Sequence, residues 1–281
     1  MHKKVTTILN SPLGYKYKCA IIYNFIDDKP FTTSFYIGNP KTTPDEACIT
    51  ISVYYSHPEN RFANPSTASL ILVKYYEACA ENRGLKQGEG TIDMLNTSMS
   101  FVKRICPHIK EFKLNDASTK RCDNGSVISL PYFYITQKGQ TWYEARFNAY
   151  LEEPWYTAYK DAINKIMESK LPSFDAFKVL YIKNAADVVI NELKSIYNEG
   201  DKIKTFFNKL YEKYDKSMSC ILLQPWIDNF MMIVGLQNYV AYSAWHISVD
   251  TVPIYKFTKN NGNIYRINSY NNTRKRKPWN N

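Results

Sequence analysis

The sequence predicts an α/β protein of the α+β type, with a mixed sheet and flanking helices in the N-terminal half and a mainly helical C-terminal region. Three observations carry this prediction. Short runs of alternating or β-branched apolar residues fill much of residues 15–55, and apolar residues recur at helical spacing over residues 92–105. Beyond Pro154, amphipathic segments rich in helix-forming residues predominate.

The first predicted elements are strands. In residues 15–26, alternating polar and apolar residues give way to a continuous apolar run, which is typical of a strand that enters a core. Residues 27–30 are turn formers, so we expect residues 31–37 to return as the second strand of a hairpin. A third strand is predicted at residues 47–55, where β-branched residues alternate.

Two helices are predicted next. The first is capped at Ser66 or Thr67 and runs to about Asn82, because apolar residues recur there at helical spacing and Gly84 supplies a stop. A loop at residues 85–91 leads into the second helix. Its apolar stripe consists of Ile92, Leu95, Met99, Val102 and Ile105, and Pro107 follows its end.

The middle of the chain alternates between short elements. A strand is predicted at residues 109–114, a further apolar stretch at residues 127–135, and a helix from Gly139 to Leu151. These elements complete a predicted α/β domain that comprises residues 1–152.

A mainly helical region is predicted at residues 153–270. We expect helices at residues 155–170, 174–198 and 201–215, a buried apolar segment at 221–240, and strands within 247–257 and 263–267. Residues 271–281 are polar and basic, which is typical of a mobile tail.

The chain is basic, with a formal net charge of +10. A positive field favours partners that carry phosphate, such as a nucleotide cofactor, a nucleic acid or an anionic membrane surface. Much of the excess lies near the two ends, at residues 2–4 and in a run of four cations. That run is Arg274, Lys275, Arg276 and Lys277, and it is the predicted nucleic-acid contact.

The six cysteines form no C-x-x-C pair and are sparse for a chain of 281 residues. We therefore expect single buried thiols and a reducing compartment, either cytoplasm or nucleus, or a virion. The sequence shows neither a cleavable signal peptide nor a run of about 18 apolar residues, so we expect an intracellular protein without a membrane span.

The segment Gly88-Glu89-Gly90-Thr91 is the first candidate site. Two glycines separated by one residue allow backbone amides to turn toward a ligand, and the helix that follows adds free N–H groups and a positive dipole end, which suit phosphate. The segment is neither a P-loop nor a dinucleotide fingerprint, because no Gly-Lys-Ser/Thr and no third glycine follow. A tight turn that only starts the helix is the alternative interpretation.

The order of loop, helix, strand and the later Tyr143-Glu144-Ala145-Arg146-Phe147 segment resembles the coenzyme A-binding core of the GCN5-related N-acetyltransferase (GNAT) family over residues 47–151. The resemblance implies an acetyl-CoA-dependent transfer of an acetyl group to an amine. It implies pyrophosphate contacts from residues 87–91, that is, Gln87, Gly88, Glu89, Gly90 and Thr91. The sequence departs from the family pattern at Leu85, where Gln or Arg is usual, and lacks the glycine expected after Arg146.

The same resemblance implies that Tyr143 is the general acid that protonates the departing thiolate. The general base is not fixed by the sequence, and Asp116, Glu111 and His108 all stand near the relevant strand. A thiol dyad of Cys106 or Cys220 with His246 is a further alternative. No zinc-ligand spacing occurs among the four histidines, so no metal is predicted.

Two other functions remain open. The composition, rich in Tyr, Phe, Lys, Asn and Ile, is typical of AT-rich genomes such as those of large DNA viruses. A non-catalytic structural or assembly protein of a viral particle or replication machinery, with protein partners or a second copy of itself, is therefore an alternative. Nucleic-acid binding through the basic tail is compatible with it.

Overall fold

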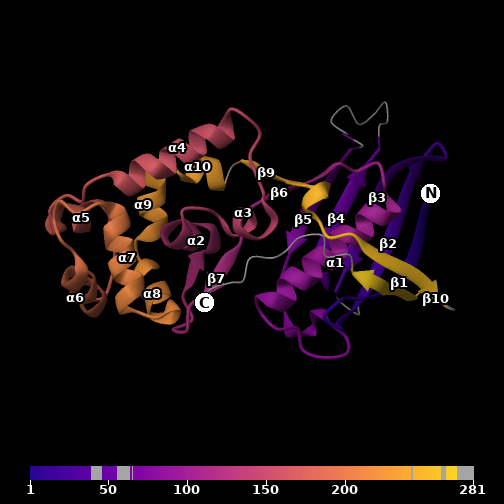
Figure 1. Cartoon of the computed structure of the whole chain (residues 1–281), viewed down its shortest axis with the longest axis horizontal. Coiled ribbons are helices and arrows are strands. Elements are labelled where there is room, and N and C mark those ends of the chain that lie inside the picture. Colours follow the sequence, from indigo (N-terminus) through magenta and orange to yellow (C-terminus); the bar gives the residue numbers. More distant parts are fainter. Residues whose placement is uncertain (39–45, 56–63, 65, 242, 261–263, 271–281) are drawn as a thin grey trace. The chain divides into compact units, whose positions relative to one another are not determined.

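The computed structural model describes residues 1–38, 46–55, 64, 66–241, 243–260 and 264–270. The chain divides into two compact units, the first comprising residues 1–114 and 246–281 and the second residues 115–245. Strands dominate the first unit and helices the second (Figure 1), so the predicted α+β class is confirmed.

The predicted boundary near residue 152 lies inside the second unit. Residues on its N-terminal side are tied to the helices that follow it, by a disulfide between Cys122 and Cys220 and by a 2.5 Å hydrogen bond between the hydroxyls of Thr136 and Tyr211. The helical region therefore begins about forty residues earlier than the composition change at Pro154 suggests.

A nine-stranded sheet forms the first unit. Its strand order is β10 (Tyr255–Asn260), β11 (Ile264–Tyr270), β1 (His2–Asn10), β2 (Lys16–Ile26), β3 (Lys29–Ile37), β4 (Ile49–Tyr54), β5 (Thr67–Val73), β6 (Glu111–Asn115) and β9 (Ala244–Ser248).

Strands β1 to β5 form an antiparallel meander, which includes the three strands predicted between residues 15 and 55. The turn between β2 and β3 has positive φ at both Asp27 (48°) and Asp28 (58°). Two left-handed residues in a tight hairpin match the right-handed twist of the strands, and aspartate adopts this conformation more readily than most residues.

Strand β1 was not expected from the sequence. Its basic residues Lys3 and Lys4 pair with Tyr23 and Ile22 of β2, so the N-terminal charges belong to a sheet strand and not to a tail. Their side chains are largely exposed, which leaves the charges hydrated.

The helix predicted from residue 66 or 67 to about 82 is wrong. Residues 67–73 form β5, which pairs antiparallel with β4 and parallel with β6. Side chains alternate across it, since Ala68 and Leu70 are buried whereas Ile71 is 58% exposed. Period-2 burial and β-branched residues therefore outweigh the helical spacing of the same apolar residues. Only a 3₁₀ turn at Glu77–Cys79 remains of the predicted helix.

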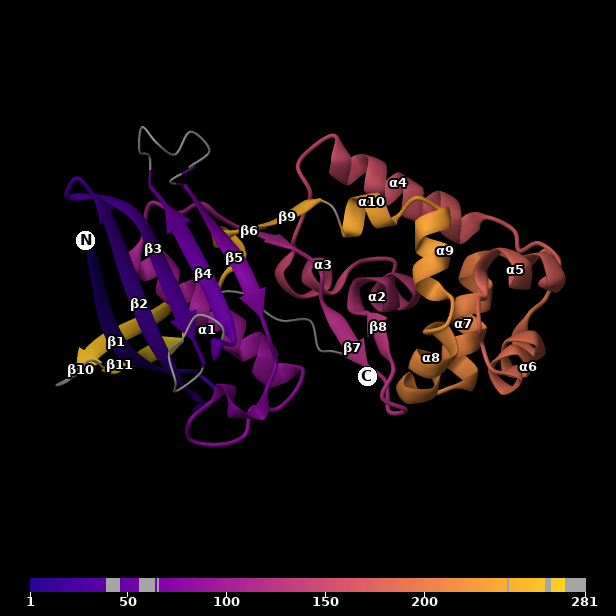
Figure 2. The same ribbon diagram turned by 180° about the vertical axis from the view of Figure 1, so that it is seen from behind.

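Helix α1 (Glu89–Ile105) follows, as predicted, and packs on one face of the sheet. It lies in front of the strands in Figure 1 and behind them in Figure 2. The ring of Phe101 makes edge contacts with Phe35 of β3 and Phe257 of β10. These aromatic contacts bury the middle of α1 and fix it across the sheet.

The second unit holds a two-stranded sheet and nine helices within its described residues. The strands are β7 (Thr119–Arg121) and β8 (Val127–Ser129). The helices are α2 (Leu130–Lys138), α3 (Trp142–Phe147), α4 (Trp155–Glu168), α5 (Phe174–Tyr181), α6 (Asp187–Ile196), α7 (Ile203–Lys213), α8 (Lys216–Leu223), α9 (Ile227–Ile233) and α10 (Gln237–Val240).

Two of the predicted helices are shorter than expected. The helix predicted at residues 174–198 is interrupted after Tyr181, and Asn184 takes a left-handed conformation (φ 56°) in the break. The helix predicted from Gly139 to Leu151 is limited to α3, because left-handed residues precede and follow it at Gly139 and Asn148. Side-chain periodicity shows neither break, since both depend on backbone conformation.

Near the C-terminus, the predicted strand at residues 247–257 is replaced by β9 and β10, which a 3₁₀ turn at Val249–Thr251 separates. The strand predicted at residues 263–267 corresponds to β11. The predicted basic tail at residues 271–281 lies outside the described residues.

Four of the six cysteines form disulfides, so the expectation of six single thiols is wrong. Cys48 pairs with Cys79, and Cys122 with Cys220. All four residues are at most 2% exposed. Disulfides form in oxidising settings, which speaks against the reducing compartment expected from the sequence.

Candidate functional site

The loop before α1 has the conformation that its glycines suggested. Gly88 is the N-cap residue, with φ 81° and ψ −94°, and a Cβ added there would meet no atom within 4 Å. Gln87, Gly88 and Glu89 are exposed. A conformation reserved for glycine at an open position leaves the backbone accessible to a ligand.

The amides at this helix start have no partner within the described part of the chain. The first intrahelical hydrogen bond runs from the N–H of Ile92 to the carbonyl of Gly88, and no side chain caps the helix. The N–H groups of residues 88–91 are therefore left over, as at any uncapped helix start. Together with the helix dipole, they form a site that suits an anion.

The connection that leads into this loop is anchored to the sheet. Leu85 is 1% exposed and lies 3.0 Å from the position of a Cβ on Gly90, so a larger residue at position 90 would displace it. The carbonyl of Leu85 accepts a 2.7 Å hydrogen bond from Tyr75. The guanidinium of Arg83 lies 4.4 Å from the ring centroid of Tyr15. These contacts fix the approach of the chain to Gly88.

The loop also follows a strand of a parallel pair. Strand β5 leads through the connection and α1 into β6, and the two strands pair only over Thr67 to Ser69 and Glu111 to Lys113. Ligands of open sheets bind beyond the carboxyl ends of such parallel strands. The prediction that a helix precedes this loop is therefore wrong, because strand β5 and a 3₁₀ turn precede it.

The predicted acid, Tyr143, lies in α3 of the second unit, whereas residues 87–91 lie in the first. Its ring is 4% exposed and packs against Trp142 and Phe147. Burial, and to a lesser extent the charge of Asp116, raise the pKa of Tyr143 far above that of a free phenol. A higher pKa makes the phenol a weaker proton donor.

The candidate base Asp116 belongs to the same unit as Tyr143. It is buried, with an exposed fraction of 2%. Its Oδ1 accepts hydrogen bonds from the backbone N–H and the hydroxyl of Ser118, whereas Oδ2 has no hydrogen-bond partner among the described residues. Burial raises the pKa of Asp116 to about 6, and the charge of Glu144 adds to the shift.

Glu144 is the centre of this buried cluster, although the sequence drew attention only to its neighbour. Its Oε2 accepts hydrogen bonds from the Thr141 N–H (2.7 Å) and the Tyr159 hydroxyl (2.6 Å). Its Oε1 accepts from Lys160 Nζ (3.1 Å) and, less closely, from Tyr156 (3.4 Å). With four donors around it, Glu144 holds α3 against α4.

The other two candidate bases are engaged elsewhere. Glu111 accepts a 2.8 Å hydrogen bond from Thr67 and lies 3.2 Å from His246 Nδ1. His108 is exposed and packs on the ring of Tyr55. Of the three candidates, only Asp116 combines burial with an unpartnered oxygen.

The alternative thiol dyad is not supported. Cys220 is in a disulfide and so offers no thiol. Cys106 is a buried free thiol 3.7 Å from the Tyr55 hydroxyl, and burial raises its pKa. A raised pKa keeps the group in the unreactive thiol form.

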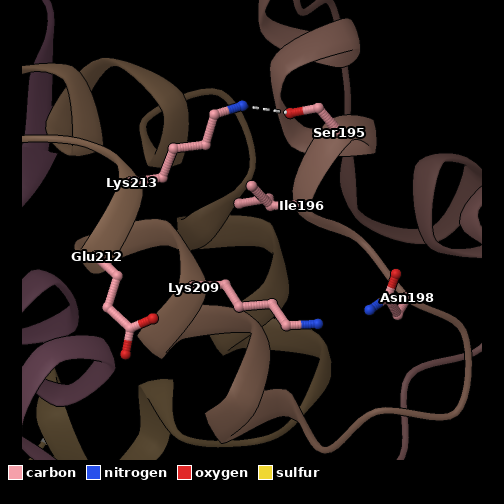
Figure 3. A pocket seen from close by; sticks show the side chains of 6 residues that line it. All are labelled: Ser195, Ile196, Asn198, Lys209, Glu212 and Lys213. Carbon is pink, nitrogen blue, oxygen red and sulfur yellow. Dashed lines mark hydrogen bonds between the residues drawn. The ribbon is translucent and has the colours of Figure 1, made fainter.

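An open cavity of about 420 Å³ lies between α6 and α7 in the second unit. Figure 3 shows Lys209 and Lys213 reaching from α7 toward Asn198 and Ser195. Lys209 Nζ lies 2.6 Å from Asp201, and Lys213 Nζ lies 2.8 Å from the Ser195 hydroxyl and 3.5 Å from Glu192. Because carboxylates already pair both cations, this cavity is a weak candidate for an anion.

Within the described residues, no cluster of three or more His, Cys, Asp or Glu could hold a metal ion. In the same residues, none of the helices combines the length and apolarity needed to cross a bilayer. The four cations predicted to contact nucleic acid, Arg274 to Lys277, lie outside the described part of the chain.

Neither a protein-family model nor a curated protein sequence matches this chain.

Proposed function

We propose that the first unit binds the pyrophosphate of an acyl-CoA at the start of α1, and that the protein transfers the acyl group to an amine. The observation that carries the proposal is the run of amides at residues 88–91, left without acceptors among the described residues at an open glycine bend. The resemblance of the loop-helix-strand order to the GNAT core supplies the reaction.

The distribution of charge supports a phosphate ligand on this unit. The second unit contains 15 Lys and Arg and 15 Asp and Glu, whereas the whole chain contains 36 and 26. The first unit therefore holds 21 basic and 11 acidic residues, and with them the entire net charge of +10. A positive unit attracts a polyanionic cofactor at long range.

The residues of the loop are compatible with a pyrophosphate. Gly88 leaves open space where a side chain would otherwise stand, and the positive end of α1 faces that side. Glu89 opposes binding, since its exposed carboxylate stands at the first helical position. A bound acyl-CoA would supply the acyl group as an activated thioester.

The assignment of Tyr143 as the acid remains a prediction. Its raised pKa means that proton donation from the closed aromatic cluster would be unfavourable, so the role requires that the hydroxyl becomes more hydrated when ligands bind. A Tyr143→Phe variant tests the role separately from binding. Unchanged turnover with unchanged acetyl-CoA affinity would remove Tyr143 from the reaction.

Acetyl-CoA titration by calorimetry tests the binding site. Gly88→Glu should weaken binding at least about tenfold, because a carboxylate beside the free amides repels phosphate. Gly125→Glu is the matched control, since Gly125 also has positive φ (83°) and no atoms near its Cβ position but lies in the second unit. Equal affinities of the two variants would refute the site.

A second variant should change affinity in the opposite direction. Glu89→Gln removes the one acidic side chain in the first turn of α1 and should strengthen acetyl-CoA binding severalfold. Unaltered affinity in both Gly88→Glu and Glu89→Gln would mean that the loop serves only to start the helix.

A protein-binding role is the second candidate, and exposed apolar side chains of the second unit favour it. Val179 of α5 is 81% exposed, and Met232 and Ile233 of α9 are about half exposed. The unit has no net charge, which suits a protein partner better than a nucleic acid. Light scattering that shows a monomer at all concentrations, unchanged by Val179→Asp, would exclude self-association through these side chains.

A further inference from the structure

The second unit contains a buried negative charge that its own hydrogen bonds do not neutralise. Both hydrogen-bond donors to Asp116 come from Ser118 and are neutral. Glu144, by contrast, has the ammonium group of Lys160 at 3.1 Å. The two carboxylates are close enough to raise the pKa of Asp116 through repulsion.

An ionised carboxylate in this position is costly. Asp116 is 2% exposed, and its Oδ2 lacks even a neutral donor within the described residues. A buried charge without a partner destabilises a protein strongly unless a proton or a counter-ion neutralises it. Asp116 is therefore neutralised either by a proton or by a cation from outside the described residues.

We propose that Asp116 binds the ammonium group of a small primary amine, with Tyr143 beside it. A primary ammonium group supplies both the positive charge and the N–H donors that Oδ2 lacks. Trp142, Tyr143 and Phe147 form an aromatic cluster with ring centroids 4.9 to 6.0 Å apart, and its member Tyr143 is near enough to Asp116 to be affected by the charge of the carboxylate. Aromatic faces attract ammonium groups, whereas they do not stabilise an anion.

The closed packing limits the size of the ligand. Because Asp116 is only 2% exposed, the site should favour a slender ammonium group over a bulky one. A quaternary ammonium ion should be excluded, since it has no N–H to donate. A proton is the competing occupant, and it prevails at acidic pH.

The groups that face Asp116 come from two helices. Tyr143 and Glu144 lie on α3, and Tyr159 lies on α4. The charge of Asp116 contributes to the raised pKa of Tyr159. Lys160 of α4 is paired with Glu144. The phenols stay neutral, so ammonium binding should depend on the ionisation of Asp116.

The inference deepens the proposed function, on which it rests for the identity of an amine as acyl acceptor, but its test needs no acyl-CoA. The thermal midpoint of the full-length protein is measured with methylammonium chloride, tetramethylammonium chloride and sodium chloride at equal ionic strength. At pH 8, methylammonium alone should raise the midpoint, by about 2 °C or more at saturation. At pH 4.5, where Asp116 is protonated, the rise should disappear.

Two variants locate the effect. Asp116→Asn should abolish the rise with methylammonium, whereas Asp161→Asn, an equal charge change at an exposed position of α4, should preserve it. If Asp116→Asn does not fold, carboxyl carbon NMR of the wild-type protein replaces it, and the Asp116 resonance should shift on titration with methylammonium.

The proposal would be overturned if methylammonium raised the thermal midpoint of Asp116→Asn as much as that of the wild type. It would also be overturned if tetramethylammonium raised the wild-type midpoint as much as methylammonium does. The absence of any response with an unmoved Asp116 resonance would overturn it as well, and would leave a proton or a buried water as the occupant. A failed acetyl-CoA titration with a positive methylammonium result would refute the pyrophosphate site only. Acetyl-CoA binding without a methylammonium effect would refute the ammonium site only.

Discussion

Asp116 and Glu144 show how the surroundings of a buried carboxyl decide its role. Glu144 is surrounded by four donors, one of them an ammonium, so its charge stabilises the junction of α3 and α4. Asp116 has only Ser118 for both of its hydrogen bonds. The same burial therefore produces a structural anchor in one case and an acid that titrates near pH 6 in the other.

The pH dependence of stability should report Asp116 directly. Its pKa is raised to about 6 in the folded state, against an ordinary value of 3.8. Between these values the folded state holds a proton that the unfolded state has lost, so the free energy of unfolding falls as the pH rises. The full loss, reached above pH 6, is about 3 kcal/mol.

Asp116→Asn should remove this fall, because the amide stays neutral and can still accept from Ser118. Urea unfolding between pH 4 and pH 7 measures the difference, which should favour the variant increasingly with pH. Other carboxyls titrate in the same range, so the comparison is with Asp161→Asn. A constant offset between wild type and Asp116→Asn across this range would mean that the pKa of Asp116 is not raised.

At the scale of elements, the sequence was informative where one pattern prevailed. The alternation in β2 to β4 and the stripe along α1 each have one interpretation, and both were confirmed. The apolar residues of 67–73 fit both the helical spacing and the alternation of a strand. Pairing with β4 and β6 makes this segment a strand. That choice depends on residues remote in sequence, so local periodicity could not make it.

The candidate sites divide in the same way. The loop at Gly88 could be predicted because glycine spacing is local, and the Thr-x-x-Glu spacing of the capping box formed by Thr141 and Glu144 is a local signal of the same kind. The disulfides join residues 31 and 98 positions apart, so the fold alone reveals them. The proximity of Asp116 to Tyr143 depends in the same way on tertiary packing.

The disulfide between Cys122 and Cys220 should be a major source of stability for the second unit. It connects the β7–β8 hairpin to α8 across 98 residues, and a loop of that length corresponds to about 4 to 5 kcal/mol in the chain-entropy description. Replacing both cysteines with alanine should lower the midpoint of urea unfolding accordingly.

Tryptophan fluorescence separates this effect from that of the other disulfide. Trp142, Trp155, Trp226 and Trp245 all lie in the second unit, and the fifth tryptophan, Trp279, lies outside the described residues. The fluorescence transition should therefore move strongly in Cys122→Ala/Cys220→Ala and less in Cys48→Ala/Cys79→Ala. Equal shifts would mean that the two units unfold as one.

For the whole molecule, the division of charge is the dominant feature. A unit with net charge +10 and a neutral unit on one chain suggest two kinds of partner, one rich in phosphate and one not. Of the positive excess, four charges belong to Arg274 to Lys277, so the rest of the first unit still carries +6. The tail and the body of the unit can therefore contribute separately to phosphate binding.

Deletion of residues 271–281 distinguishes these contributions. If the tail contacts nucleic acid, the slope of log affinity against log salt for a single-stranded oligonucleotide should become shallower by up to about 3 on deletion, since about 0.7 counterions are released for each phosphate neutralised. Acetyl-CoA affinity should stay unchanged, because residues 87–91 remain. An unaltered salt slope would assign nucleic-acid binding to residues outside 271–281. A parallel loss of acetyl-CoA affinity would instead show that the tail serves the cofactor site, which the present assignment of the pyrophosphate to the backbone amides of α1 does not allow.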